Sequence, residues 1–335
     1  MNLSSSEIRH LLTTSDPQAV EALTAEACRV RDGVYGQRVF MRGLIEITNH
    51  CKNNCLYCGI RRDAECRRYR LTPRQILDCC RTGHELGFRT FVLQGGEDGW
   101  FTDEVLTALI AQIKQCFPDC AVTLSLGERG RASFARLREA GADRYLLRHE
   151  TADPRHYGRL HPQEMSFDHR MQCLHDLRDL GYQVGAGFMV GSPGQSLETL
   201  MEDLHFIDEF RPEMVGIGPF IPATGTPFEH EPAGSVDLTL RLLSVIRIIH
   251  PRVLLPATTA LGTLHPKGRE RAVQAGANVV MPNLSPQDTR ALYAIYDNKL
   301  ATGSEAAESV ADLRMRMEAI GYEVPVDRGD YIPAR

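Results

Sequence analysis

The sequence lacks the features of a membrane, secreted or nucleic-acid-binding protein. No apolar run approaches the ~20 residues that a membrane helix requires. The first residues, MNLSSSEIRHLLTTSD, do not show the basic and then apolar pattern of a signal peptide. Lysine and arginine (38) nearly balance aspartate and glutamate (43), and the net charge of −5 gives no reason to expect binding to nucleic acid or a membrane surface. We therefore expect a cytoplasmic protein.

Cysteine is missing from much of the chain, since none of the ten follows Cys173. In a reducing compartment, thiols are expected to stay free or to bind metal. Seven of the cysteines are scattered, which is typical of buried inert thiols. The other three, Cys51, Cys55 and Cys58, lie in EITNHCKNNCLYCGI with the spacing C-x3-C-x2-C. Structural zinc would need four ligands and a disulfide framework an even number, so this group lacks a fourth member.

Strand and helix patterns alternate along the chain. Apolar or β-branched runs predict eight strands, at 39–48, 89–94, 121–126, 143–148, 183–190, 214–220, 252–258 and 278–282. Amphipathic helical segments separate them, and several end in a glycine that suits a helix C-terminus. This α/β pattern predicts a (β/α)8 TIM barrel, with a doubly wound open sheet as the alternative. We expect a short N-terminal helical extension over 1–35, the barrel over 36–290, and a C-terminal closing helix and tail packed on the barrel over 291–335.

The cysteine group follows directly on the first predicted strand. In a barrel this places it at the C-terminal face, where active sites are built. A 4Fe-4S cluster usually takes one cysteine per iron, so three local cysteines leave one iron open to another ligand. The alternatives are a zinc site completed by Cys66 or a histidine, in a structural or interaction module, and three unrelated thiols. A nucleotide-binding domain built on VGAGFMVGSPG is disfavoured, because its glycines do not fit G-x-G-x-x-G.

With Tyr57 before its last cysteine, the motif resembles the radical S-adenosylmethionine (SAM) superfamily. RGLIEITNHCKNNCLYCGIRRD, VLQGGED, GADRYLLRHETADP, MVGIGPFIPATGTP and LLPATTALGT extend the resemblance, over about residues 36–296, to the HydE family of FeFe-hydrogenase maturation enzymes. The resemblance implies a 4Fe-4S cluster on the three cysteines and SAM on the open iron, split to a 5′-deoxyadenosyl radical. Methylornithine synthases and biotin-synthase-like enzymes share the barrel and the loop, but the TT and LLRHETA segments favour the HydE family.

The resemblance also implies roles for individual side chains. Cofactor contacts are implied for Tyr57, Gln94, Gly95, Gly96, Glu97, Glu150, Arg170 and Met281. Substrate contacts are implied for Thr123, Ser125, Arg148, Met214, Thr258, Thr259 and Tyr293. The planar guanidinium of Arg148 suits a substrate carboxylate. Taken without the resemblance, a structural Arg148–Glu150 ion pair and simple packing of the methionines are the alternatives.

The implied substrate is a cysteine-bound iron carbonyl–cyanide complex made by the partner maturase HydG. Its product would contribute to the two-iron subcluster of the hydrogenase and be loaded onto the scaffold protein HydF. A reducing electron donor is also implied. No side chain stands out as an acid or base, which suits radical chemistry. Some members of the family carry C-terminal cysteines for a second cluster, and because this sequence has none there, we expect no second cluster in that position.

Overall fold

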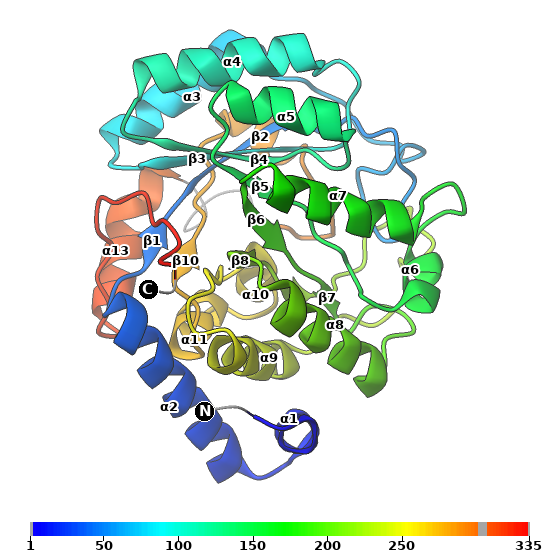
Figure 1. Ribbon diagram of the computed structural model, residues 1–335, viewed down its shortest axis with the longest axis vertical. Coiled ribbons are helices and arrows are strands. Elements are labelled where there is room, and N and C mark those ends of the chain that lie inside the picture. Colours follow the sequence, from blue (N-terminus) through cyan, green and yellow to red (C-terminus); the bar gives the residue numbers. More distant parts are fainter. Residues whose placement is uncertain (1–2, 301–306, 334–335) are drawn as a thin grey trace.

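The predicted first strand forms two short strands, β1 (Phe40–Met41) and β2 (Gly43–Thr48), in the computed structural model, which describes residues 3–300 and 307–333. One parallel sheet contains β2, β3 (Thr90–Gly95), β4 (Ala121–Ser125), β5 (Arg144–Leu146), β6 (Gln183–Ala186) and β8 (Met214–Val215), in that order. At the carboxyl ends of two of the predicted strands, β7 (Met189–Val190) pairs with β9 (Gly218–Pro219). Figure 1 shows the strands surrounded by helices.

The sheet closes into a ring through its last strands. The predicted seventh strand, 252–258, contributes only single bridges, from Leu254 to Met214 and from Pro256 to Val279. The eighth, β10 (Val279–Val280), pairs in parallel with β1. Leu44 of β2 then bridges Asn283. All eight predicted strands therefore take part in a closed barrel, which confirms the expected fold class.

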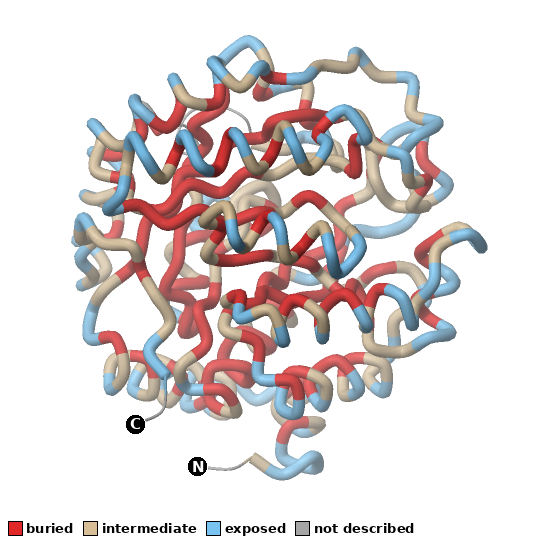
Figure 2. The backbone as a smooth tube through the Cα atoms, turned by 45° about the horizontal axis from the view of Figure 1, so that its top comes forward, coloured by how far each residue is buried: buried red, intermediate tan, exposed pale blue. Residues whose placement is uncertain are grey.

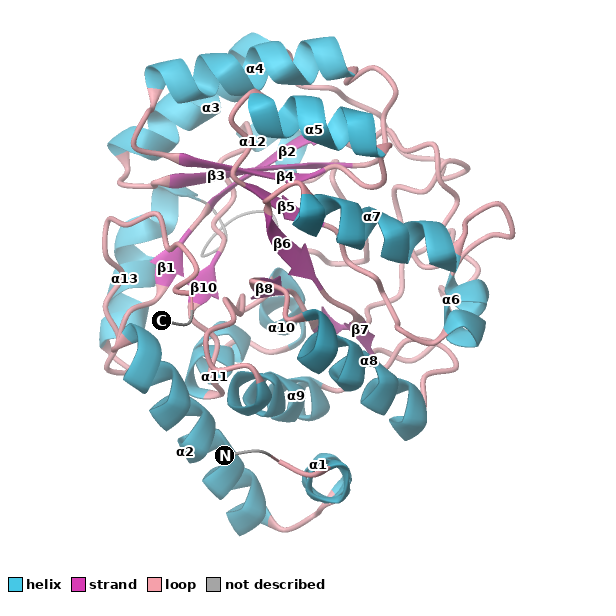
Figure 3. Ribbon diagram, viewed as in Figure 1, coloured by secondary structure: helices cyan, strands magenta, loops and turns pink. Residues whose placement is uncertain are grey.

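The barrel helices lie outside this ring, as Figure 3 shows. They are α3 (Pro73–Glu85), α4 (Asp103–Cys116), α5 (Arg131–Glu139), α6 (Pro154–Leu160), α7 (Phe167–Asp179), α8 (Leu197–Phe210), α9 (Val236–Ile249), α10 (Thr259–Leu264), α11 (Gly268–Gln274) and α12 (Gln287–Arg290). Ile45 and Ile47 belong to the apolar core, and Figure 2 shows that the buried segments of the backbone lie inside the molecule. Because side chains alternate along a strand, Glu46 and Thr48 face the barrel interior.

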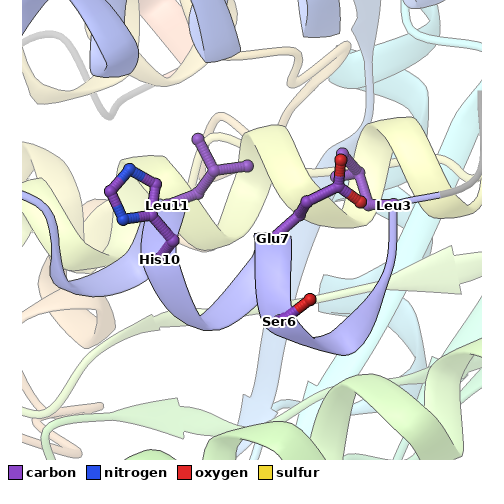
Figure 4. A pocket seen from close by; sticks show the side chains of 5 residues that line it. All are labelled: Leu3, Ser6, Glu7, His10 and Leu11. Atoms are coloured by element: carbon purple, nitrogen blue, oxygen red, sulfur yellow. The ribbon is translucent and has the colours of Figure 1, made fainter.

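The described segments near both ends of the chain pack on the barrel. The helices α1 (Ser5–Thr13) and α2 (Pro17–Tyr35) contact α9, and α13 (Val310–Glu318) follows a short 3-10 helix, η2 (Ala307–Ser309). A surface pocket on α1, lined by Leu3, Ser6, Glu7, His10 and Leu11, contains none of the predicted site residues (Figure 4). The expected limits of the three segments stay a prediction. No described helix has the length and apolar character needed to cross a membrane.

Candidate active site at the mouth of the barrel

The three motif cysteines lie on the loop that follows β2, as the sequence predicts. Backbone hydrogen bonds tie this loop to three other segments. Lys52 N donates to the carbonyl of Glu97 (2.9 Å), and Leu56 N donates to that of Leu160 (3.0 Å). Gly59 N donates to the carbonyl of Ile295 (2.9 Å). The loop is therefore fixed over the carboxyl ends of the strands, which is where barrel enzymes place their active sites.

Arg68 holds the shape of the loop from within. Its Nη1 donates to the carbonyls of Asn49 and Ile60, and its Nη2 donates to those of Arg61 and Ala64. These carbonyls lie on both sides of the cysteine motif, so one guanidinium with its five donors pre-organises the ligand loop. Sequence reasoning did not select this residue, because nothing in the run RRYR indicates which arginine turns inward.

The thiols of Cys51, Cys55 and Cys58 are free, and their arrangement suits a cluster better than a single ion. Burial raises the pKa of all three, to about 12 for Cys58. Thiolates at this site therefore need a positively charged partner, which bound iron provides. Three cysteine ligands leave one iron of a 4Fe-4S cluster open, whereas a structural zinc ion needs four ligands. The residues thus fit a 4Fe-4S cluster.

Two glycines at the end of β3, Gly95 and Gly96, allow the first strand and the cysteine loop to approach closely. A Cβ on Gly96 would lie 2.3 Å from the carbonyl oxygen of His50 and 2.7 Å from Cβ of Cys51. A Cβ on Gly95 would lie 2.9 Å from Cγ2 of Thr48. The absence of side chains therefore has a local structural reason, which is packing against the cysteine loop. Contact between these glycines and SAM stays a prediction.

The polar neighbours of the two glycines are held by other segments. Gln94 Nε2 donates to the hydroxyl of Tyr293 (3.5 Å). Glu97 Oε1 accepts the backbone N–H of Glu128 (2.8 Å), and Glu97 Oε2 lies 3.1 Å from Nζ of Lys52. The structure thus brings Gln94 and Tyr293, which the sequence analysis assigned to cofactor and substrate, into one contact.

Arg148 and Glu150 form the ion pair that the sequence analysis gave as the alternative to ligand binding, but they leave hydrogen-bonding capacity unused. Arg148 Nη2 lies 3.1 Å from Glu150 Oε2. Neither of these two buried atoms makes a hydrogen bond, and neither does Arg148 Nε. Buried polar atoms in folded proteins nearly always have partners, so unsatisfied ones point to a ligand. The ion pair is thus present, and the contacts of Arg148 with substrate and of Glu150 with SAM stay predictions.

Arg170 contacts the backbone of Arg148 and an acidic side chain on another loop. It is 7% exposed; its Nε donates to Glu128 Oε1 (2.5 Å), and its Nη1 donates to the carbonyl of Arg148 (2.6 Å). Arg170 therefore fixes the backbone at the end of the fourth predicted strand, and its predicted contact with the SAM carboxylate stays a prediction. Glu128 was not expected from the sequence, because it lies on a loop remote from α7.

Two threonine hydroxyls add further unsatisfied groups. Oγ1 of Thr123 on β4 and Oγ1 of Thr258 are buried without a partner. Thr258 precedes α10, yet its side chain makes no capping hydrogen bond, while Thr259 begins that helix. Ser125 ends β4 beside Gln94. Two free hydroxyls and the Arg148 guanidinium are donors of the kind that bind a carboxylate.

A cavity inside the barrel brings together three of the predicted residues, Thr123, Met214 and Met281. Its lining is Arg42, Val92, Thr123, Leu146, Met214, Gly216, Leu254, Pro256, Val279 and Met281. Nη1 of Arg42 lies 2.9 Å from Sδ of Met214. Met214 is therefore held by an arginine as well as by packing, and direct contact between either methionine and a ligand stays a prediction.

The segment 290–299 contacts the cysteine loop and the barrel interior and contains groups that sequence reasoning missed. Lys299, only 7% exposed in its side chain, places Nζ 2.7 Å from Oε1 of the buried Glu46. Asn283 Nδ2 donates to the other oxygen of Glu46 (2.8 Å). Strand alternation could have shown that Glu46 faces inward, but nothing local indicates its partners. On the cysteine loop, the Tyr57 hydroxyl lies 3.4 Å from Nε2 of His161.

Comparison with known proteins agrees with this geometry. The model of the Radical SAM superfamily matches residues 45–207. The [FeFe] hydrogenase maturase subunit HydE of Thermotoga maritima is 42% identical over 96% of this chain and 92% of its own. The 3-methylornithine synthase of Methanosarcina barkeri is 30% identical over 98% of this chain and 92% of its own. A crystal structure of methylornithine synthase has a TM-score of 0.87 and 30% identity, covering 97% of this chain and 94% of that one.

The chain belongs to the radical SAM superfamily, whose members use a 4Fe-4S cluster and SAM, and it is an enzyme. Within that superfamily it is of the HydE type, as the identity along nearly the whole chain shows. The expected cofactors, family and fold class are thus confirmed.

Proposed function

We propose that the protein acts in hydrogenase maturation, on a cysteine-bound iron carbonyl–cyanide complex. The observation that carries this proposal is the 42% identity with a hydrogenase maturase subunit over 96% of the chain. The unsatisfied donors at the barrel mouth support it, because the cysteine of such a substrate has a carboxylate for them to bind.

In this proposal the motif cysteines hold the cluster, and Glu150, Arg170 and residues 94–97 bind and orient SAM. When bound, the reduced cluster supplies the electron that splits SAM into methionine and a 5′-deoxyadenosyl radical. The chain's own contribution is to position the reactants and to exclude water. Residues 290–299 serve this purpose, since Lys299 and Glu46 join them to the barrel interior.

The substrate carboxylate would bind to the guanidinium of Arg148 and the hydroxyls of Thr123 and Thr258. Nε and Nη2 of Arg148 and both threonine hydroxyls are buried and make no hydrogen bond within the protein. The planar guanidinium favours a ligand that presents two oxygens in one plane. Thr259, Ser125, Met214 and Tyr293 would complete the chamber around the rest of the complex.

The proposed partners follow from the same assignment. A HydG-type maturase would supply the iron complex, a HydF-type scaffold would receive the product, and a reducing donor would deliver the electron to the cluster. The protein would act between the two maturases in that sequence.

Anaerobic reconstitution tests the chemistry of this proposal. We expect roughly four irons per chain, as one cubane on three cysteines requires, and 5′-deoxyadenosine formation after reduction with SAM present. If the reduced enzyme forms no 5′-deoxyadenosine even with a cysteine-derived substrate, the proposal has to be abandoned. Maturation of apo-hydrogenase with the other maturases tests the substrate: a hydrogenase that activates equally well without this protein would contradict it.

A methylornithine synthase is the second candidate, favoured by 30% identity over nearly the whole chain and by the TM-score of 0.87. It predicts that the reconstituted enzyme forms 3-methylornithine and has no effect on hydrogenase maturation. Assaying both products with one preparation separates the two candidates.

A further inference from the structure

Glu150 lies in a turn that is held by its neighbour across the strand ends. Its φ angle is 67°, in the left-handed region that few residues other than glycine adopt. The backbone N–H of Glu150 donates to the carbonyl of Gly187 (3.0 Å). In return, the N–H of Gly187 donates to Nδ1 of His149 (3.2 Å). An unfavourable conformation at a functional position persists where the surrounding structure enforces it.

His149 and Asp203 form a completely buried pair behind this turn. Nε2 of His149 lies 3.3 Å from Oδ1 of Asp203, and both side chains are 0% exposed. Because Nδ1 accepts the Gly187 N–H, the proton of the neutral ring sits on Nε2 and is donated to Asp203. Burial lowers the pKa of His149 to about 3, so the ring is neutral at physiological pH. This hydrogen bond therefore fixes the orientation of the imidazole.

Asp203 holds the chain on both sides of Glu150. The same Oδ1 that receives His149 also accepts the backbone N–H of Ala152 (2.6 Å). Asp203 comes from α8, so one carboxylate from a separate helix connects the residue before Glu150 with the second residue after it. Its other oxygen, Oδ2, is buried without a partner, and burial raises the pKa of this carboxyl. Such a carboxyl group costs stability, which an apolar side chain of similar size would not do.

We propose that His149 and Asp203 are positioning residues that fix Glu150 in the orientation in which it binds SAM. The inference rests on the proposed function, because it takes Glu150 as a SAM contact. Neither His149 nor Asp203 has any exposed surface, so their effect on a ligand is transmitted through the turn that they hold. The stability lost by burying a polar pair is explained if the turn must be rigid.

Four variants of the reconstituted holoenzyme test this role. Asp203→Leu and His149→Phe remove the hydrogen bonds while filling the space. Asp203→Asn keeps an acceptor oxygen for both donors. Glu202→Gln is the matched control, because Glu202 is the exposed neighbour of Asp203 on the same helix. A displacement of about 1 Å can lower a rate ~100-fold. We therefore expect Asp203→Leu and His149→Phe to weaken SAM binding at least ~10-fold.

The readouts are the SAM dissociation constant, iron content and the melting temperature. We expect unchanged iron content in every variant. For Asp203→Asn and Glu202→Gln we expect a SAM affinity within ~3-fold of wild type, because a tenfold change would correspond to a lost interaction of about 1.4 kcal/mol. If Asp203→Leu does not fold, His149→Phe carries the test. Wild-type SAM affinity in a folded His149→Phe variant overturns the proposal.

A double-mutant cycle with Glu150→Gln distinguishes positioning from general destabilisation. Residues that act through one group give non-additive losses. Asp203→Leu or His149→Phe should therefore cause little further loss of SAM affinity when Glu150→Gln is already present. Fully additive losses would overturn the positioning role while leaving the proposed function in place. Unchanged SAM affinity in Glu150→Gln alone would overturn both the positioning role and the SAM contact assigned to Glu150, whereas 5′-deoxyadenosine formation tests the reaction class separately.

Discussion

Arg144 lies near the start of the fourth predicted strand, at the end of the barrel that we call the floor, and Arg148 lies at the end of the same strand, at the mouth. The surroundings of the two side chains differ. Arg144 is fully buried, and each of its three nitrogen atoms donates: Nε to Gln183 Oε1 (3.0 Å), Nη1 to Thr90 Oγ1 (2.9 Å), and Nη2 to the carbonyl of Arg328 and to Asp330. Arg148 is one-third exposed in its side chain and has one ion-pair contact, with buried nitrogen atoms left unsatisfied.

The difference separates stability from binding. At the floor, the C-terminal tail supplies the partners that a buried charge needs, so Arg144 contributes to holding the tail on the barrel. At the mouth, the protein leaves donors without partners, which costs stability unless a ligand satisfies them. Substitutions at the mouth are therefore expected to change activity with little change in stability, and substitutions at the floor are expected to do the opposite.

The largest expected effect at the mouth comes from the cysteine motif. Cys58→Ala should abolish 5′-deoxyadenosine formation, because a cluster with one ligand fewer does not form in its functional state. The fold should persist, since the thiol makes no structural cross-link. Iron content, circular dichroism and a SAM cleavage assay measure this. The control is Cys28→Ser, which should keep full activity, because Cys28 lies outside the motif and its thiol donates to the carbonyl of Gln274. SAM cleavage by Cys58→Ala would contradict the assignment of Cys58 as a cluster ligand.

The next effect is at Arg148 itself. Arg148→Lys keeps the charge but loses the planar pair of donors, so the KM for a carboxylate substrate should rise by about 10- to 100-fold. The melting temperature should stay within about 2 °C of wild type, because little structural hydrogen bonding is lost. Steady-state kinetics and calorimetry measure the two. Arg155→Lys, at an exposed position, should change neither the KM nor the melting temperature. A large drop in melting temperature for Arg148→Lys would show that the mouth contributes to stability as the floor does.

The floor gives the reverse result. Arg144→Leu should reduce the free energy of unfolding by about 3 kcal/mol, because Oδ1 of Asp330, Oε1 of Gln183 and Oγ1 of Thr90 lose the donor that Arg144 supplies. The rate of 5′-deoxyadenosine formation by the folded protein should remain close to that of wild type. Urea unfolding and the SAM cleavage assay measure these quantities. Loss of activity at full stability would show that the floor takes part in the reaction.

Most of the architecture could be predicted from local patterns, and most of the partners could not. All eight strands follow from apolar runs and glycine turns. The seventh forms only bridges, because Pro256 has no N–H to donate to a ladder. By contrast, the sequence does not distinguish Arg144 from Arg148. Two of the residues that accept hydrogen bonds from Arg144 are Arg328 and Asp330, which lie 184 and 186 residues away in the sequence.

In the candidate site, too, local sequence patterns do not predict which distant groups become partners. The cysteine loop is visible because its ligands are adjacent in sequence, and its role rests on spacing. Arg68, Glu128 and Lys299 act through contacts between segments that lie apart in the chain, or through carbonyls that have no sequence signature. Periodicity reports which face of a strand is buried, but not which polar group it meets there.

The smallest expected effect is a pH dependence confined to the floor. Burial would raise the pKa of Asp330, but Arg144 and Arg328 more than offset this and hold it below its usual value of 3.8. A carboxyl whose folded pKa is lowered stabilises the protein above its unfolded pKa, and this contribution is lost as the pH falls through the folded value. Asp330→Asn should therefore destabilise the protein at pH 7 and make unfolding less sensitive to acid below about pH 4. Denaturant midpoints between pH 3 and 7 measure this, with Asp327→Asn as the control; equal acid sensitivity in Asp330→Asn and wild type would show that the ion pair at the floor does not couple to stability.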